Sequence, residues 1–383
     1  MTSPFFPNGE DDIADAIADA VRAGDTLAIV GGGSKAAVGA QTHARALSLA
    51  GLTGIVDYDP AELVLTVRPG TLLSDVQALV ANEQQMLAFE PFDHGPIFGS
   101  PIGRATIGGV MAAGVAGSQR VSSGGARDHL LGFRAVSGRG EAFVAGAKVV
   151  KNVTGYDLPK LAAGSWGRVF ALTELTMKVL PRPRVLATRV IAGLDDEQAI
   201  AAMAMAMGSQ AEIAAAAHLP SYDGTALTVF RVQGFGPSVA ARCAMLETLL
   251  TPIGRVEALS EDEAGRVWDD LRTLRPLGTT QPLWRINVAP SAAVSVTTAL
   301  APFGARWMLD WAGGLIWLVL DADVAVVRDA ATRAGGHATL MRGDETLRAA
   351  VPAFHPGQPG LVALESRVRR AFDPAGVFET GRF

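Results

Sequence analysis

Cysteine is almost absent from this chain of 383 residues, which contains only Cys243. A disulfide bond within the chain is therefore impossible. We also do not expect this chain to hold an iron–sulfur cluster, because such clusters generally need about four thiolates. A chain without disulfides fits a reducing compartment, and we expect a cytoplasmic protein.

Long apolar runs and basic blocks are missing as well. No apolar run reaches the roughly 18–20 residues that a membrane helix needs. The N-terminal sequence MTSPFFPNGEDD lacks the basic and apolar regions of a signal peptide. Any membrane association would therefore be peripheral, through partners at the inner face of the cell membrane. The net charge of −5 comes without a basic cluster, which argues against nucleic-acid binding.

Metal-ligand spacing is the third absence. The six histidines show neither the H-x-H nor the H-x-x-x-H spacing that is typical of metal sites. The sequence therefore predicts no metal site. What is present can build a large core, because hydrophobic residues make up 49% of the chain and charged residues 19%. The length suggests two domains, or one domain with a large insertion.

Glycine is abundant, first in the segment Gly31–Lys35, which reads GGGSK and directly follows an expected apolar strand. A strand followed by glycines presents backbone N–H groups to an anion, often a phosphate. Gly31, Gly33 and Ala36 also fit the looser spacing of a Rossmann turn, with Asp57 as the ribose-binding acid. A structural turn, a Rossmann loop and another kind of phosphate loop are equally open at this point.

The next segments weaken the Rossmann interpretation. Gly54–Tyr58 and Leu63–Arg68 are expected to be adjacent strands without a helix between them, which does not continue a βαβ series. Leu72–Ala81 is an expected helix with its N-cap near Thr71 or Ser74.

A second glycine-rich stretch covers Thr106–Gly132, and a crowded polar segment comes before the strand expected at Val169–Val179. That polar segment contains Lys151, Asn152, Thr154, Tyr156, Asp157 and Lys160. So many glycines indicate a backbone that turns tightly or approaches a ligand closely. Together, the loops could enclose an extended cofactor that carries phosphates.

The stretch 185–341 alternates strands and helices in two rounds. This order predicts an α+β domain in which helices cover one face of an antiparallel sheet. Met203, Met205 and Met207 on one of its helices are expected to pack rather than to bind a ligand. Helices are then expected at Gly343–Ala350 and Leu361–Phe372.

These motifs resemble a known family. GGGSK, the V-R-P-G turn that contains Pro69 and Gly70, the TIGG of Thr106–Gly109 and the run Lys151–Pro183 are similar to the FAD-binding domain of the vanillyl-alcohol-oxidase/PCMH flavoproteins. Within that family they resemble the E subunits of bacterial glycolate oxidases. The ending Phe372–Arg382 is similar to the family's C-terminal signature.

The resemblance implies an α+β fold with three parts. Residues 1–184 would form a two-lobed PCMH-type FAD-binding domain, residues 185–345 a ferredoxin-like α+β cap domain, and residues 346–383 a segment that packs back on the FAD-binding domain. It also implies residues that bind FAD, namely Gly31, Gly32, Gly33, Ser34, Lys35, Pro69, Gly70, Pro101, Thr106, Ile107, Gly108, Gly109, Ala113, Gly114, Gly117, Gly164, Ser165, Gly167 and Val169.

Departures from the family pattern refine these expectations. No histidine lies in or beside Gly31–Lys35, where many relatives attach the flavin covalently, so we expect noncovalent FAD. Relatives that oxidise D-2-hydroxy acids carry an H-x-G-D-G-N metal motif and a later E-H pair. Gly343-Asp344 and Glu365-Ser366 stand in their place, which indicates that the metal site is lost. Arg168 replaces the small residue usual after the G-S-x-G turn.

The sequence does not identify catalytic residues. Oxidation of a 2-hydroxy acid needs a base for the hydroxyl proton and a cation for the carboxylate. Candidates for a pocket are Trp284, Arg285, Arg306, Trp311 and His355, and, within the flavin motif, Tyr156 and Lys160. Glu90, Asp93 and His94 are expected to form a solvated connection.

The first functional hypothesis is an FAD-binding subunit of a glycolate (2-hydroxy acid) oxidase complex. A sister FAD subunit would carry out the metal-assisted dehydrogenation, and an iron–sulfur subunit would carry electrons towards quinone. The alternatives are a self-sufficient FAD-dependent oxidase of a sugar or alcohol, and a scaffold subunit that keeps the flavin fold without turnover. An NAD-dependent Rossmann enzyme is the least favoured.

Overall fold

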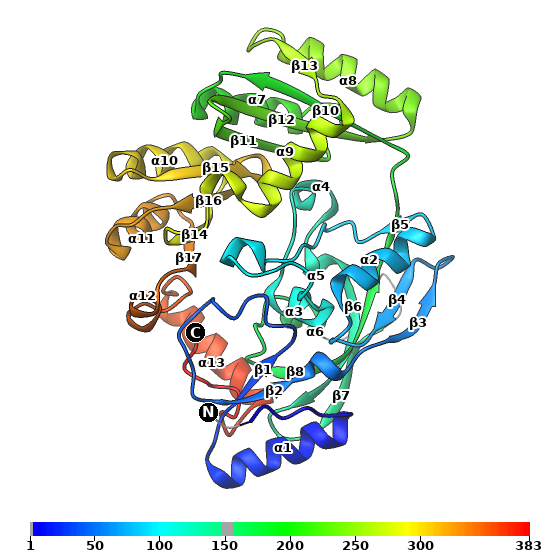
Figure 1. Ribbon diagram of the computed structural model, residues 1–383, viewed down its shortest axis with the longest axis vertical. Helices are drawn as coiled ribbons and strands as arrows, with labels where there is room; N and C mark the ends of the chain where they lie inside the picture. Colours follow the sequence, from blue (N-terminus) through cyan, green and yellow to red (C-terminus); the bar gives the residue numbers. More distant parts are fainter. Residues whose placement is uncertain (1–2, 148–155) are drawn as a thin grey trace.

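The computed structural model describes residues 3–147 and 156–383 (Figure 1). A small lobe at the N-terminus consists of α1 (Glu10–Ala23), β1 (Leu27–Val30) and β2 (Arg45–Ser48), and its two strands pair in parallel. Apolar residues of α1, such as Ile13 and Ile17, recur at helical spacing and form one buried cluster with these strands. Strand β1 ends at Val30, and the glycine-rich segment Gly31–Lys35 follows directly.

The second lobe is a five-stranded antiparallel sheet with short helices around it. Its strands follow the order β3-β4-β8-β6-β7, and a separate pair, β5 and β9, closes the lobe. The strands are β3 (Ile55–Asp59), β4 (Val64–Val67), β5 (Gln85–Met86), β6 (Leu130–Ser137), β7 (Ala142–Gly146), β8 (Phe170–Lys178) and β9 (Leu180–Pro181). The helices are α2 (Leu73–Asn82), α3 (Ile107–Ala113), α4 (Arg120–Ser123), α5 (Ala126–His129) and α6 (Leu158–Ala162).

The third part is an eight-stranded sheet whose neighbouring strands all pair antiparallel. Its order is β13-β10-β12-β11-β15-β16-β14-β17. The strands are β10 (Val185–Ala192), β11 (Ala215–Tyr222), β12 (Thr225–Gly234), β13 (Val256–Ala258), β14 (Leu283–Asn287), β15 (Arg306–Asp310), β16 (Leu315–Val319) and β17 (His337–Arg342). The helices are α7 (Asp196–Met207), α8 (Gly236–Leu250), α9 (Glu261–Thr273), α10 (Ala293–Leu300) and α11 (Val324–Arg333). We call this part the cap.

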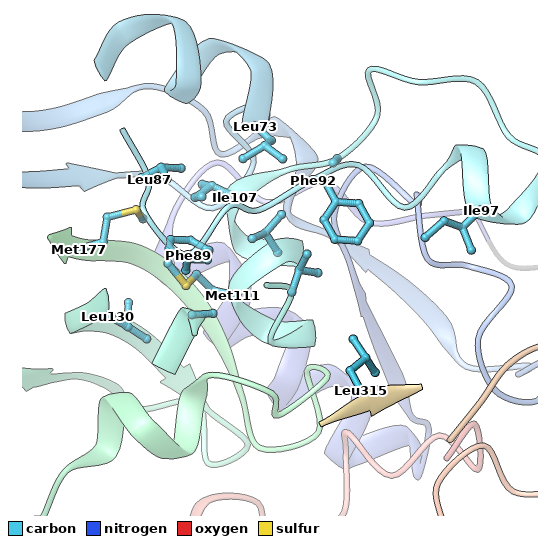
Figure 2. Close-up of a cluster of buried hydrophobic side chains, with 14 of the residues drawn as sticks. Leu73, Leu87, Phe89, Phe92, Ile97, Ile107, Met111, Leu130, Met177 and Leu315 are labelled. Atoms are coloured by element: carbon cyan, nitrogen blue, oxygen red, sulfur yellow. The ribbon is translucent and has the colours of Figure 1, made fainter. Parts of the chain in front are cut away.

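The two faces of the cap sheet have different neighbours, because side chains alternate along each strand. Trp284 and Ile286 of β14 pack with α10 and α11, while α7 and α8 cover the other half of the same face. The opposite face packs on the second lobe, where Leu315 of β16 joins the buried cluster around Ile107 and Met111 of α3 (Figure 2). The cap and the second lobe therefore share one core.

The C-terminal segment returns to the small lobe after α12 (Glu345–Ala350) and α13 (Pro359–Phe372) (Figure 1). The Leu27 N–H at the start of β1 donates to the Val377 carbonyl oxygen at 2.7 Å, and the Phe378 side chain is buried in the α1 cluster. Asp373 ties this turn together, because its carboxylate accepts from the N–H groups of Val377 and Phe378 at 2.9 and 2.8 Å.

The α+β fold and the antiparallel cap sheet that the sequence predicts are confirmed, whereas the N-cap of α2 is not. Leu72 occupies that position and gives no side-chain cap. Thr71 is unavailable because its hydroxyl is bonded to Gly54, accepting from the N–H at 3.0 Å. The Rossmann alternative is wrong, since β1 leads to β2 without a helix and Asp57 lies on β3 in an antiparallel pair.

Replacement of Asp373 by alanine should destabilise the protein. Asp373 is 3% exposed, so the substitution leaves two buried N–H groups unpaired and should lower the free energy of unfolding by about 1–3 kcal/mol. Urea denaturation measures this difference. Glu379→Gln is the control, because this exposed partner of Arg369 should contribute less than about 1 kcal/mol. Equal losses in the two variants would contradict the anchoring role of Asp373.

Candidate functional site

A cavity lies where loops of both lobes meet the C-terminus. Its walls come from Gly31–Lys35 after β1, from Thr106–Gly109 at the start of α3, from Ser165–Gly167 before β8, and from Arg382 and Phe383. These segments are far apart in the sequence. The fold brings both glycine-rich loops to one cleft, as a cofactor held between two lobes requires.

The first two loops contact each other through backbone. A Cβ atom on Gly32 would overlap the carbonyl oxygen of Arg104, and one on Gly31 would collide with the Thr106 hydroxyl. Gly33 has a φ of 77°, which favours glycine. The loops can therefore lie this close together only because Gly31 and Gly32 have no side chains.

The start of α3 is fixed in the same way. The Thr106 hydroxyl accepts a hydrogen bond from the Gly109 N–H at 3.4 Å, which caps the helix. A Cβ atom on Gly108 would lie 2.6 Å from the Cβ atom of Pro69. The helix thus enters the cavity directly beside the turn at Pro69.

Asp93 organises the second loop, a role that the sequence analysis missed. Its Oδ2 atom accepts from the N–H groups of Gly103, Arg104 and Ala105 at 2.8, 3.0 and 3.2 Å, and Oδ1 accepts from Gly95 at 2.8 Å. The prediction that Asp93 belongs to a solvated connection is wrong. An aspartate ten residues before its bonding partners gives no local sequence signal, so only the folded loop reveals the role.

The C-terminus holds the first loop from the other side. The Arg382 guanidinium donates to the carbonyl oxygens of Lys35 and Val38, each at 2.9 Å, and to that of Ala36 at 3.1 Å. The Phe383 ring stacks on Phe354 with centroids 5.0 Å apart. The tail is therefore part of the cavity wall.

Lys35 supplies the charge of the first loop. Burial lowers the pKa of its ammonium to about 8, partly offset by the Asp93 carboxylate. A bound anion would favour the charged form of this lysine and raise the pKa again. Lys35 is therefore suited to an anionic group such as a diphosphate.

Most of the predicted FAD-binding residues meet at this cavity. Those that line it are Gly31, Gly32, Gly33, Ser34, Lys35, Pro69, Thr106, Gly108, Gly109, Ala113, Ser165 and Gly167. Those that do not line it are Gly70, Pro101, Ile107, Gly114, Gly117, Gly164 and Val169. Ile107 and Val169 are buried in the core, and a Cβ atom on Gly117 would lie 2.7 Å from that of Glu90. Ile107, Val169 and Gly117 therefore serve packing around the cavity.

A second, smaller pocket, which we call the basic pocket, adjoins the cavity. It shares Lys35, Ala113 and Trp166 with the cavity. The cap supplies Arg285, Trp317, Thr339 and Met341, and the second lobe supplies Phe92, His94 and the segment Ala113–Ala116; Phe354 completes the wall. This pocket thus lies at the seam between the second lobe and the cap.

A larger chamber lies beyond Trp317, between the second lobe and the cap. Glu90 and Arg231 form an ion pair at 2.6 Å across this seam. Asp310 accepts a hydrogen bond from the Ser118 hydroxyl at 2.9 Å, and burial, with a smaller effect of Glu90, raises the pKa of Asp310 to about 7. The chamber connects the basic pocket with a polar seam.

Among the predicted cap candidates, only Arg285 has its side chain in the basic pocket. Trp284 is buried among the cap helices, and Arg306 donates to the Leu277 carbonyl oxygen at 3.0 Å. The guanidinium carbons of Arg120 and Arg285 lie over the Trp311 ring, 4.3 and 5.2 Å from its centroid. His355 bonds the Thr332 hydroxyl at 3.1 Å. Periodicity could not separate these residues, because the face of a strand is decided by what packs on it.

The polar segment before β8 does not reach the cavity with its described side chains. Tyr156 is 91% exposed, and Lys160 pairs with Asp157 at 2.8 Å on the surface. The suggestion that Tyr156 and Lys160 are well placed for chemistry is wrong. Lys151, Asn152 and Thr154 lie outside the described residues.

Comparison with known proteins identifies this architecture. Residues 4–146 match the family model described as "FAD binding domain". The chain is 34% identical over 359 residues to glycolate oxidase subunit GlcE of Escherichia coli (strain K12), covering 93% of this chain and 92% of that protein. The chain belongs to the PCMH-type FAD-binding flavoprotein family. This flavoprotein uses FAD and is an FAD-dependent oxidoreductase.

Other relatives match part of the flavoprotein. D-lactate dehydrogenase of Anaerostipes hadrus is 34% identical over 145 residues, 38% of this chain and 29% of that protein. Glycolate oxidase subunit GlcD of Bacillus subtilis (strain 168) is 31% identical over 134 residues, 35% of this chain and 27% of that protein.

Solved structures show the same fold. A crystal structure of p-cresol methylhydroxylase with substrate bound has a TM-score of 0.72 at 14% identity and covers 99% of this chain and 88% of that chain. A structure of alkyldihydroxyacetonephosphate synthase has a TM-score of 0.69 at 14% identity, with 99% and 76% covered.

The residues around the cavity fit FAD. Gly31, Gly32 and Gly109 would leave backbone exposed to a dinucleotide, and Lys35 would supply a cation for the diphosphate. The described lining of the cavity contains no histidine or cysteine, and noncovalent attachment stays our prediction. When bound, FAD supplies the acceptance of a hydride and the later release of its electrons. The chain's own residues bind, orient and shield the cofactor.

Substitution of Gly32 by alanine should prevent FAD binding. The new Cβ atom would overlap the Arg104 carbonyl oxygen and push the two loops apart. The flavin content of the purified protein, measured by visible absorbance, should fall to near zero while the circular dichroism spectrum is kept. Gly51→Ala is the matched control, because a Cβ atom there has no neighbour within 4 Å. Normal flavin content in Gly32→Ala would contradict the assignment of the cavity.

FAD affinity should fall as the pH rises through the pKa of Lys35. Without FAD this pKa is about 8, so Lys35 is charged below it, and binding of a diphosphate raises it. Affinity is therefore highest below pH 8 and should drop by up to about tenfold between about pH 7 and about pH 9. Titration of flavin fluorescence at each pH measures this. The Lys35→Met variant should bind weakly with little pH dependence over this range, and an unchanged profile in that variant would assign the effect to another group.

Proposed function

We propose that this chain is the FAD-binding redox subunit of a glycolate-type 2-hydroxy acid oxidase complex. The observation that carries the proposal is the 34% identity to glycolate oxidase subunit GlcE along nearly the whole length of both chains. In this proposal a sister FAD subunit performs the metal-assisted dehydrogenation. An iron–sulfur subunit then takes electrons away, since Cys243 alone cannot hold a cluster.

The positions where the family carries metal ligands support this division of work. Asp344 caps α12, accepting from the Leu347 N–H at 2.7 Å, and Glu365 pairs with Arg168 at 3.0 Å. Within residues 3–147 and 156–383, no group of three or more His, Cys, Asp and Glu side chains is placed to hold a metal ion. The part of the reaction that needs a metal therefore belongs to another subunit in this proposal.

We place the complex in the cytoplasm, at the inner face of the membrane through its partners. In the described parts of the chain, no helix has both the length and the apolar character to span a bilayer. Contact with the membrane is therefore assigned to the other subunits.

A self-sufficient FAD oxidase is the second candidate. The basic pocket beside the FAD cavity favours it, because a chain that only carries electrons does not need a small basic pocket at that place. Turnover of the chain alone would distinguish the two functions.

The isolated chain should be yellow when produced with ample FAD, and glycolate alone should not bleach it. Bleaching should require the companion subunits, which pull-down of the native protein should recover and mass spectrometry identify. Rapid anaerobic bleaching of the isolated chain by glycolate or D-lactate would favour the self-sufficient oxidase. A colourless chain would contradict both and favour the scaffold role.

A further inference from the structure

The basic pocket gathers two cationic groups and one uncharged imidazole from separate parts of the fold. Arg285 comes from β14 of the cap, Lys35 from the first glycine-rich loop and His94 from the loop after β5. The lining contains no aspartate or glutamate. Within the described residues, Arg285 makes no hydrogen bond or ion pair, and its guanidinium only lies over the Trp311 ring.

Such an arrangement is costly without a counterion. Burial, with a smaller effect of Arg120, lowers the pKa of Arg285 to about 10. Burial holds the pKa of His94 well below its usual value, and the charges of Lys35 and Arg285 lower it further. Arg285 is partly buried, and a cation that is largely removed from water without a partner is unfavourable unless a counterion compensates it. The pocket is therefore complementary to an anion.

The geometry of the sheet holds Arg285 in place. Arg285 lies opposite Trp317 of β16 and Thr339 of β17, and all three side chains line the pocket. Trp317 and Met341 supply apolar walls, and the Thr339 hydroxyl can donate or accept a hydrogen bond. The pocket thus offers one strong cation and one hydroxyl on a rigid support, which suits a small carboxylate with an oxygen on the next carbon.

The position of the pocket links it to both neighbouring spaces. It shares Lys35 and Ala113 with the FAD cavity, so its occupant would lie beside the segment that contacts the cofactor. It also shares Phe92, Ala116 and Trp317 with the large chamber between the second lobe and the cap. The basic pocket therefore lies between the FAD cavity and this chamber.

We propose that Arg285 and Thr339 form a binding site of this chain for the carboxylate of a small 2-hydroxy or 2-oxo acid, with Lys35 and His94 lining its far side. The proposal rests on the 2-hydroxy acid specificity of the proposed function, and it applies whether the acid is oxidised in this subunit or in the sister subunit. It assigns contact with the acid to this subunit without a metal ion.

Spectral titration of the FAD-loaded chain tests the site. D-lactate, glycolate and oxalate should perturb the flavin absorbance with saturation, whereas 1,2-propanediol, which lacks a carboxylate, should not. Arg285→Met should weaken oxalate binding by about tenfold or more, because it removes a charge-assisted hydrogen bond. Arg285→Lys should bind with intermediate affinity, and Thr339→Val should weaken D-lactate more than acetate.

Arg306→Met is the matched control, since Arg306 lies on β15 of the same sheet and donates to a carbonyl oxygen outside the pocket. It should bind oxalate like the unchanged protein. Oxalate binding that is the same in Arg285→Met would overturn the proposal, and so would a loss of FAD binding in Arg285→Met, which would assign the cation to the cofactor. Failure of the unchanged chain to bind FAD would instead contradict the proposed function.

Discussion

The structure depends on the direct approach of two backbone segments. Gly31 and Gly32 lie against Arg104 and Thr106 so closely that a single methyl group would separate them. The loops that form the FAD cavity thus come from different lobes, and their contact is what makes one cavity of them. Asp93 fixes the second loop through four N–H groups, and Arg382 fixes the first through three carbonyl oxygens.

The cap has a second role besides covering the FAD-binding lobes. One face of its sheet packs on its own helices, and the other joins the core of the second lobe, so the two parts share apolar residues (Figure 2). At the seam the apolar packing gives way to charged groups. The ion pair of Glu90 with Arg231 crosses it, while Arg285 has no such partner among the described residues. The pair of Glu90 and Arg231 therefore holds the cap on the second lobe, whereas the Arg285 guanidinium is left for a ligand.

The roles of several residues are visible only in the folded structure. Asp93 and His94 gave no motif, yet one organises a loop and the other lines the basic pocket. Tyr156 and Lys160 lie within the flavin motif, yet Tyr156 is exposed to solvent and Lys160 pairs with Asp157 on the surface. Gly117 fits the family pattern, but it is glycine because Glu90 occupies the adjacent space. Motif membership thus indicated the region correctly and the role of individual side chains less well.

By itself, the sequence determined the elements of the cap, because the periods of apolar residues are local properties, and its resemblance to a known family implied the fold class and the cofactor. It also determined that one cysteine cannot hold a cluster. Tertiary structure alone decided which of Arg285 and Arg306 faces the basic pocket, and that the C-terminus closes the FAD cavity. These depend on contacts between residues hundreds of positions apart, and no local pattern encodes which face of a strand such a contact will cover.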